Sequence, residues 1–336
     1  MSTALVTGGA GFLGFHIAQG LTEAGWSVRL LDVVEPASEL PAGQTFIHAD
    51  VRDEDAVRAA VDGCDVVVDN AALVPITRAT PEGFRSVNVG GCKVTLDAAR
   101  TAGAYVVHIS STSIYGLPSG MPVTEETPLA PFEPYGVSKA EAEELVHRER
   151  ADGLVVASLR SRALLGRGRL GVFDPIFNRI RAGKVVPLIG RGDKILQMTD
   201  ARDFAAAVLA CIERRANDDY NIGAAQYGTP REDFHALIER VGSSSRLVSI
   251  PLWAVRAVVQ PLDMIGRSPF SEWHWKAADT TFYSSLDKAE RELGWTPRYS
   301  NVDALERTYR EWLAGAGGGS AHLSPLRGVF AKVLRG

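Results

Sequence analysis

The chain has 336 residues and a mass of 36.1 kDa, and 46% of its residues are hydrophobic, which is enough for the core of one large α/β domain or of two smaller ones. Its formal net charge is −4 at pH 7 and its pI is near 6.0, so no basic surface is expected and a nucleic-acid-binding function is disfavoured. A small-molecule ligand is favoured instead.

The three cysteines, Cys64, Cys92 and Cys211, are spread along the sequence without a C-x-x-C pair. This spacing predicts buried thiols in a reducing compartment rather than a disulfide framework or a zinc site. The seven histidines do not cluster, and we expect no structural metal. The first predicted strand starts by residue 3, and charged residues and proline interrupt the apolar stretch 250–265. We therefore expect a soluble cytoplasmic protein without an integral membrane segment.

Apolar patterns along the first half of the chain predict strands that alternate with helices. The strands are expected at residues 3–7, 26–32, 44–50, 64–72, 104–110 and 154–160, and the helices at residues 12–24, 53–61, 81–102 and 134–150. Such alternation is typical of a parallel sheet that helices cover on both faces. The predicted fold class is α/β, a doubly wound Rossmann sheet with a smaller C-terminal α/β lobe.

The first predicted strand and helix are joined by the glycine-rich turn TGGAGFLG, which has two readable registers. Gly9, Gly11 and Gly14 match G-x-G-x-x-G, whereas Gly8, Gly11 and Gly14 match G-x-x-G-x-x-G. In either register the glycines allow an unusual backbone, a close ligand and close packing of helix on strand. Exposed N–H groups at the helix start then suit a pyrophosphate. A tight turn without a ligand is the alternative.

An acidic residue, Asp32, ends the second predicted strand, 18 residues after Gly14. A carboxylate there can accept hydrogen bonds from both hydroxyls of an adenosine ribose, and it favours NAD because the 2′-phosphate of NADP would meet a like charge. The alternative is an acid that merely ends a strand. The segment ADVRD after the third strand places Asp50 and Val51 near the adenine ring. These features predict a dinucleotide-binding domain over residues 1–165.

Beyond residue 165 the pattern becomes irregular, apart from a helical segment at 200–215. We expect residues 166–313 to form mostly a smaller substrate-binding lobe over the strand ends, with a return of the chain to the first domain around 197–225. Residues 314–336 read as a glycine-rich linker followed by a basic amphipathic tail. A loosely attached tail is one reading of this segment, and a helix that docks on a membrane surface or a partner is the other.

The stretch PYGVSKAEAEELV carries the predicted chemistry. Tyr135 and Lys139 are four residues apart, so on a helix the ammonium can approach the phenol. A phenol with a pKa of about 10 needs roughly 4 kcal/mol of preferential stabilisation of its phenolate to act as a base near neutrality. Lys139 and an oxidised nicotinamide ring could supply it, and Ser111 would direct its hydroxyl at the same reacting oxygen. For the pair alone, a half-exposed tyrosine beside a solvated lysine is the alternative.

With these motifs in place, the sequence resembles the extended short-chain dehydrogenase/reductases, and within them the NAD-dependent epimerase/dehydratase family. The resemblance covers roughly residues 3–313, through TGGAGFLG, LLD, ADVRD, NAA, VNVGG, ISSTSIYG, PYGVSK, YNIG and KAERELGWTP. It implies a Rossmann domain with a small C-terminal substrate lobe, tightly held NAD, and a homodimer formed through the helices near 81–102 and 134–150. It also selects the glycine register of Gly8, Gly11 and Gly14.

The resemblance also implies the site residues. The catalytic set would be Ser111, Tyr135 and Lys139. The cofactor-binding residues would be Gly8, Gly11, Phe12, Leu13, Gly14, Asp32, Asp50, Val51, Ala71, Asn88 and Lys139. Substrate contacts are expected from Thr112, Ser113, Arg162 and Arg169.

The reaction is indicated by the two residues that follow Ser111. Family members that dehydrate or decarboxylate sugars typically have an acidic side chain there, whereas this chain has Thr112 and Ser113, as in sugar 4-epimerases. The resemblance therefore implies epimerisation of a nucleotide sugar through a transient keto sugar. The alternatives are an alcohol dehydrogenase or ketoreductase of hydroxysteroid or polyketide type, and a non-catalytic NAD-binding protein.

Two departures from the family pattern concern the substrate. Ala163 stands in LRSRALLGRG where an asparagine often contacts the nucleotide sugar, and Leu196 stands in GRGDKILQM where an arginine often grips the diphosphate. Four arginines within ten residues could replace these contacts by bidentate pairing with phosphate, or could form a solvated basic loop. They are Arg160, Arg162, Arg167 and Arg169.

Overall fold

The computed structural model describes residues 2–36, 38–77, 79–168, 173–255, 257 and 280–315. These residues form two units, which are described separately below. The first unit is drawn from the chain up to Leu164, from Ala201–Gly223 and from Ser284–Arg298. The second is drawn from the described residues of Leu165–Asp200, from those of Ala224–Tyr283 and from those that begin with Tyr299.

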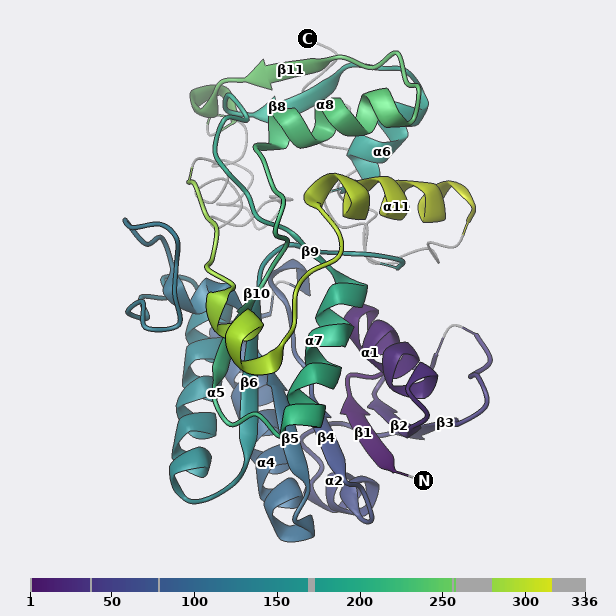
Figure 1. The fold of residues 1–336 in the computed structure, drawn as a ribbon, viewed down its shortest axis with the longest axis vertical. Coiled ribbons are helices and arrows are strands. Elements are labelled where there is room, and N and C mark those ends of the chain that lie inside the picture. The colour runs from purple at the N-terminus through teal and green to yellow at the C-terminus, as the bar shows by residue number, and fades with distance from the viewer. Residues whose placement is uncertain are drawn as a thin grey trace. The chain divides into compact units, whose positions relative to one another are not determined.

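A seven-stranded parallel sheet forms the centre of the first unit (Figure 1). Its strands are β1 (Thr3–Thr7), β2 (Ser27–Asp32), β3 (Gln44–His48), β4 (Val66–Asp69), β5 (Tyr105–Ile109), β6 (Val156–Ser161) and β10 (Asp219–Ile222). Their spatial order is β10-β6-β5-β4-β1-β2-β3, and every neighbouring pair is parallel. The order reverses between β1 and β4, which is where ligands bind in open α/β sheets. The predicted parallel α/β fold is confirmed.

Two hydrophobic clusters cover the two faces of this sheet, because successive residues of a strand point to opposite sides. Ala4 and Val6 of β1 belong to a cluster with α1 and α7, whereas Leu5 belongs to a cluster with α2, α4 and α5. The helices of the two faces are α1 (Phe12–Glu23), α7 (Ala201–Arg214), α2 (Glu54–Val61), α4 (Gly91–Ala102) and α5 (Pro134–Ala151). Figure 1 shows them packed along the strands.

The helical segment predicted over 81–102 consists of three consecutive parts. They are α3 (Pro81–Phe84), the π-helical segment η2 (Arg85–Gly90) and α4. Three further short helical segments complete the unit: η1 (Pro75–Thr77), η3 (Thr112–Tyr115) and η4 (Ala289–Leu293). Trp295, just after η4, donates from Nε1 to the carbonyl of Asp203 in α7 at 3.0 Å, which attaches this late segment to the first unit.

In the second unit, β8 (Val186–Ile189) pairs in parallel with β11 (Leu247–Ile250), and the helices are α6 (Phe173–Arg181), α8 (Pro230–Arg240) and α11 (Asn301–Leu313). A separate short sheet joins β7 (Leu164–Leu165) and β9 (Thr199–Asp200). A capping box between Ser300 and Asp303 starts α11. Asn301 Nδ2 then donates to Asp233 Oδ2 of α8 at 2.7 Å, which ties the two helices together.

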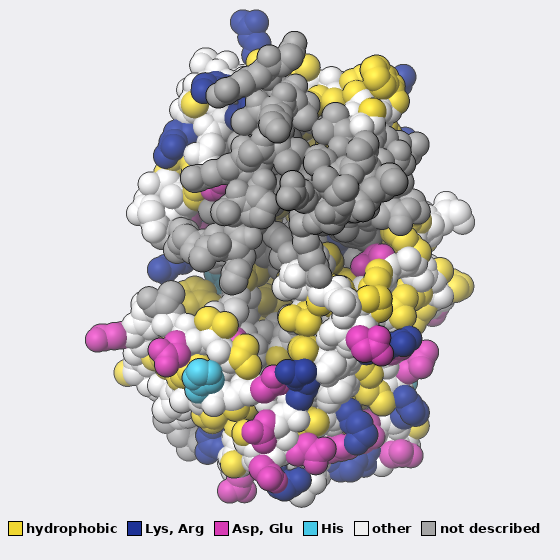
Figure 2. Space-filling model, turned by 180° about the vertical axis from the view of Figure 1, so that it is seen from behind, with side chains coloured by type: hydrophobic (Ala, Val, Ile, Leu, Met, Phe, Trp, Pro, Cys, Tyr) yellow, Lys and Arg dark blue, Asp and Glu magenta, His cyan; other side chains and the backbone are white. Residues whose placement is uncertain are grey.

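Surface and membrane features follow from the described residues alone. Cys64, Cys92 and Cys211 are buried free thiols. None of the helices formed by the described residues is long and apolar enough to span a membrane. Figure 2 shows Lys and Arg side chains interspersed with Asp and Glu on the described part of the face that it presents. The predicted tail lies outside the described residues from residue 316 onward.

Candidate active site

The glycine-rich turn between β1 and α1 is closely packed on one side and open on the other. Gly8 has φ +62°, and a Cβ there would lie 2.8 Å from the Cα of Ala71. A Cβ on Gly14 would lie 2.3 Å from the carbonyl oxygen of Gly8. Gly11 is exposed, and a Cβ there would meet within 4 Å only the oxygen of Gly8, at 3.1 Å. The turn therefore has room for a ligand at Gly11.

The N-terminus of α1 is available to an anion. Gly11 is its N-cap, so no side chain caps the helix, and among the described residues no acidic side chain stands in its first turn. Its first N–H groups and the positive end of its dipole suit a pyrophosphate. Phe12, in this first turn, is half-buried and Leu13 is buried, so their backbone N–H groups rather than their side chains are the groups offered to an anion.

Asp32, at the end of β2, lies beside this turn because β1 and β2 are parallel neighbours. Its Oδ2 accepts a hydrogen bond from the N–H of Ala10 at 3.1 Å, and its Oδ1 accepts one from the N–H of Val34 at 3.1 Å. Each carboxylate oxygen keeps a second lone pair, which can accept from a ribose hydroxyl. The open turn and this oriented carboxylate fit a dinucleotide.

The loop after β4 is held against the same edge of the sheet. Thr7 Oγ1 accepts hydrogen bonds from the N–H groups of Asn70 and Ala71, both at 3.0 Å. Asn88 accepts from the N–H of Leu73 at 2.8 Å and donates to its carbonyl at 3.1 Å. Asn88 thus holds the loop that contains Ala71, and the predicted contacts of these two residues with a cofactor stay predictions.

Asp50 and Val51, predicted near the adenine ring, have partners within the protein. The carboxylate of Asp50 is paired with Arg52 at 2.5 Å. Val51 is buried, and its Cγ1 would lie 2.4 Å from a Cβ on Gly91 of α4. The side chain of Val51 therefore packs on α4, which leaves its backbone for any contact with a ligand.

Helix α5 places Tyr135 and Lys139 on one face, one turn apart. The carboxylate of Glu133 caps the helix by accepting from the N–H groups of Tyr135 and Gly136. Tyr135 is half-buried, and its ring lies edge-on to Phe84 with 6.0 Å between centroids. Lys139 is only 3% exposed and donates from Nζ to the carbonyl of Ile109 at 2.6 Å.

This contact brings α5 to the end of β5, where Ser111 lies two residues beyond Ile109. Ser111 is half-buried and accepts a hydrogen bond from the N–H of Ser113 at 3.2 Å. The three predicted catalytic side chains therefore come from α5 and the carboxyl end of β5. The two residues after Ser111, Thr112 and Ser113, are buried within η3, and their predicted contact with substrate stays a prediction.

Three buried polar side chains behind Lys139 were not predicted from the sequence. The Nε2 of His108 lies 3.4 Å from Lys139 Nζ, and its Nδ1 lies 2.7 Å from Asp69 Oδ2. Cys92 Sγ lies 3.7 Å from the same Nδ1. A signal was present, since Asp69 and His108 are polar residues within otherwise apolar strand sequences, VVVD and YVVHI.

The arginines of the segment 160–169 differ in their surroundings. Arg160 is 2% exposed and donates to Glu143 and Asp219 at 2.6 Å each, so it is a structural residue rather than a phosphate ligand. Arg162 is also buried, and burial lowers its pKa to about 10. Arg167 is exposed, and Arg169 lies outside the described residues.

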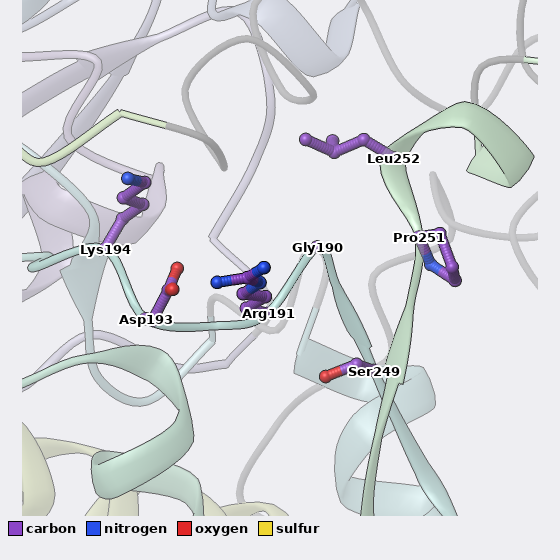
Figure 3. A pocket seen from close by; sticks show the side chains of 7 residues that line it. All are labelled: Gly190, Arg191, Asp193, Lys194, Ser249, Pro251 and Leu252. Atoms are coloured by element: carbon purple, nitrogen blue, oxygen red, sulfur yellow. The ribbon is translucent and has the colours of Figure 1, made fainter.

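A pocket of about 450 Å³ lies in the second unit, between the loop after β8 and the end of β11 (Figure 3). Its lining residues are Gly190, Arg191, Asp193, Lys194, Ser249, Pro251 and Leu252. Arg231 joins its two walls by donating to the carbonyl of Arg191 at 2.8 Å and to Ser249 Oγ at 2.5 Å. Lys194 supplies a cation two residues before Leu196, the position where the family often has arginine.

Comparison with known sequences identifies relatives over nearly the whole chain. A protein of Sinorhizobium fredii, described as uncharacterized, is 36% identical over 99% of this chain and 86% of its own length. A UDP-glucose 4-epimerase of Streptomyces lividans is 29% identical over 92% of this chain and 95% of its own. A quinoline-oxide ketoreductase of Stigmatella aurantiaca is 28% identical, with coverages of 93% and 97%.

Solved structures of similar fold include an epimerase and a dehydratase whose descriptions name nucleotide sugars. A UDP-glucose 4-epimerase of Thermotoga maritima, solved with UDP-glucose, has a TM-score of 0.78 and 24% identity over 93% of this chain and 99% of its own. A dTDP-glucose 4,6-dehydratase of Streptomyces venezuelae, solved with NAD bound, has a TM-score of 0.75 and 27% identity over 95% and 99%.

The model of the NAD dependent epimerase/dehydratase family matches residues 4–223, which include the glycine turn, Asp32 and the Tyr135–Lys139 pair. The match spans more than half of the chain, and the sequence resemblance to this family is thereby confirmed. The chain is therefore an NAD-dependent enzyme that belongs to the NAD-dependent epimerase/dehydratase family.

Proposed function

We propose that this enzyme is a nucleotide-sugar epimerase that inverts C4 of the sugar through a transient 4-keto sugar. The observation that supports the proposal is the hydrogen bond from buried Lys139 to the carbonyl of Ile109, which brings α5 to the end of β5. Tyr135 lies one turn earlier on α5, and Ser111 follows β5 and precedes two residues without acidic side chains. Epimerisation needs one acid/base group and no second acid to expel a leaving group. The epimerase relatives support the same choice.

The proposed cycle uses three side chains. The ammonium of Lys139 stabilises the phenolate form of Tyr135, because little water screens the charge. The phenolate Oη of Tyr135 then takes the proton of the C4 hydroxyl and becomes a phenol. Ser111 Oγ donates a hydrogen bond to the C4 oxygen as it becomes a carbonyl. Inversion at C4 requires that hydride leave from one face and return to the other, and bound NAD would supply the hydride acceptor and donor for this exchange. Tyr135 then returns its proton to the oxygen, so atoms and charge balance over the cycle.

The cofactor-binding residues proposed from the sequence keep that role. The pyrophosphate would lie at the N-terminus of α1 beside Gly11, and the ribose hydroxyls would donate to Asp32. Phe12, Leu13 and Gly14 would offer backbone N–H groups to the pyrophosphate. Backbone or side-chain contacts from Gly8, Asp50, Val51, Ala71 and Asn88 complete the proposed set.

For the nucleotide part of the substrate we propose the pocket of the second unit, where Arg191 and Lys194 provide positive charge for phosphate (Figure 3). Arg191→Ala and Lys194→Ala should each raise KM for UDP-glucose about tenfold or more while changing kcat little. Lys184→Ala is the matched control, since Lys184 is an exposed cation of the same unit outside the pocket. Equal KM values in all variants would show that the nucleotide does not bind in this pocket. Arg162 and Arg169 remain proposed substrate contacts.

The reaction itself is tested with purified protein and UDP-glucose, without added cofactor, by following UDP-galactose formation with NMR. The expected result is catalytic turnover supported by co-purified NAD, and its loss in Tyr135→Phe. Net oxidation or reduction that consumes stoichiometric NAD(H) would instead establish an alcohol dehydrogenase or ketoreductase. Ala163 and Leu196, which replace two substrate-gripping residues of the family, and the ketoreductase relative favour this second candidate.

We also propose a cytoplasmic homodimer, formed through α3, α4 and α5. The buried free thiols support a reducing compartment. Light scattering during size-exclusion chromatography should give twice the mass of the chain, and the mass of a single chain would refute the proposed dimer.

A further inference from the structure

We propose that Asp69 and His108 form a buried relay behind Lys139, which keeps the Lys139 ammonium protonated and directed at Tyr135 and thereby sets the pH at which Tyr135 becomes a base. Both are positioning residues, because they act through Lys139. The inference rests on the proposed role of Tyr135, and the experiment below separates failure of the relay from failure of that role.

Hydrogen-bond geometry fixes the direction of the relay. An ammonium has three donors, and Lys139 Nζ gives one to the carbonyl of Ile109 at 2.6 Å. His108 Nε2, at 3.4 Å, is placed to accept a second. The short contact between His108 Nδ1 and Asp69 Oδ2, 2.7 Å, assigns the proton of the neutral imidazole to Nδ1, which leaves Nε2 as an acceptor. We assign the third donor to Tyr135, which lies one turn earlier on the same face of α5.

Burial makes the relay important for the charge of Lys139. Burial lowers the pKa of Lys139, and the charge of Asp69 is the largest influence that opposes this lowering. Burial and the charge of Lys139 both lower the pKa of His108, so the imidazole, which lies between Lys139 and Asp69, is neutral. For Asp69, burial favours the protonated acid, but the hydrogen bond from His108 and the charge of Lys139 hold its pKa below the usual range.

The other groups that face this site do not replace Asp69. Cys92, from α4, is a neutral thiol because burial and the Asp69 charge raise its pKa well above the ordinary value. Glu143, one turn beyond Lys139 on α5, is engaged by Arg160 through Nε and Nη2 at 2.9 and 2.6 Å. The charge of Glu143 is therefore balanced by Arg160, and Asp69 is the carboxylate that balances Lys139.

A metal site is a poorer explanation of the same side chains. Asp69, Cys92 and His108 bring three ligand atoms within 4.8 Å of one another. However, the ammonium of Lys139 lies 3.4 Å from the imidazole, so a divalent cation in this cluster would meet a like charge in a buried site.

The relay predicts an effect of Asp69→Asn with a distinctive sign. Removing a carboxylate near a phenol ordinarily lowers the pKa of the phenol, because the phenolate loses a like-charged neighbour. If Asp69 acts through Lys139, its removal instead lets the ammonium lose its proton, and the pKa of Tyr135 rises. The direction of the shift therefore distinguishes action through Lys139 from simple loss of a charge.

The test is a pH titration of the Tyr135 phenolate by ultraviolet difference absorbance, taken as each protein minus its Tyr135→Phe counterpart, with the NAD-containing enzyme. We expect the phenolate to appear about one pH unit higher in Asp69→Asn than in the unmodified protein. The acid limb of kcat/KM should move by the same amount. An unchanged or downward shift in Asp69→Asn overturns the relay.

His108 variants supply a second test, which can be carried out even if the Asp69→Asn protein does not fold. His108→Gln keeps an acceptor and a donor and should retain the phenolate titration, whereas His108→Leu removes both and should shift it upward by about one pH unit. Equal titrations in the two variants overturn the relay. Asp97→Asn is the matched charge control, since Asp97 is an exposed carboxylate of α4 paired with Lys93.

Failure of the proposed function has a different signature. If Tyr135→Phe leaves turnover intact, the acid/base role of Tyr135 is lost whatever the titrations show. If Tyr135→Phe abolishes turnover but Asp69→Asn and His108→Leu titrate like the unmodified protein, only the relay fails.

Discussion

Substitution of single glycines in the turn after β1 should separate folding from cofactor binding. A Cβ on Gly14 would lie 2.3 Å from the carbonyl oxygen of Gly8 and 2.7 Å from the Cα of Gly9, which are both backbone atoms. Normal contacts at these atoms are roughly 1 Å longer. Since no side-chain rotation can relieve the overlap, α1 must move away from the turn in Gly14→Ala.

Overpacking of this kind costs about 1–3 kcal/mol, which for a chain of 336 residues corresponds to a Tm lower by roughly 1–4 °C. Gly11→Ala differs, because its Cβ would meet only the Gly8 oxygen, at 3.1 Å, and the position is exposed. We expect the Tm of the NAD-free protein to change by less than about 1 °C in Gly11→Ala, while the affinity for NAD falls by about tenfold or more.

The assay measures Tm of NAD-free protein and NAD affinity by calorimetry for both variants. Gly14→Ala should lose stability and affinity together, and Gly11→Ala affinity alone. A Gly14→Ala protein with unchanged Tm would refute the packing argument. A Gly11→Ala protein that binds NAD normally would refute the placement of the pyrophosphate beside Gly11.

Three further substitutions test energetics elsewhere in the fold. Ala163 has φ +47°, a left-handed conformation that asparagine tolerates better, so Ala163→Asn should stabilise the protein by about 0.5–1 kcal/mol in denaturant unfolding; a loss of stability would contradict this. Burial raises the pKa of Asp233 to about 6, which is above its value in the unfolded chain. The protonated carboxyl therefore favours the folded state, and we expect the free energy of unfolding to fall by about 2 kcal/mol as the pH rises from about 4 to 6. Asp233→Asn should flatten stability over this pH range, and an unchanged slope would assign it to another group. Glu143→Gln removes one of the two carboxylates that hold the buried guanidinium of Arg160 and leaves Asp219, so it should destabilise by about 1–3 kcal/mol in denaturant unfolding. Exposed Glu144→Gln should have little effect, and equal stabilities of the two variants would contradict this.

The sequence by itself determined the alternation of strands and helices between residues 3 and 160 and their order along the chain, because these depend on local patterns. Buried parallel strands are continuous apolar runs, and the glycine turn and its helix are adjacent in the chain, so strands 3–7 and 104–110 and helices 12–24 and 134–150 were predicted to within a few residues. The family could be recognised for the same reason, since its motifs are short and contiguous.

Only the tertiary structure decided which side chains meet across the sheet. Asp69, Cys92 and His108 come from β4, α4 and β5, and no sequence spacing brings them to Lys139. Likewise, the sequence indicated Arg160 as one of four arginines that could pair with phosphate. The fold instead places Glu143 and Asp219 against it in the core. A buried charge needs a partner, and the partner is chosen by packing between distant segments, which sequence periodicity does not encode.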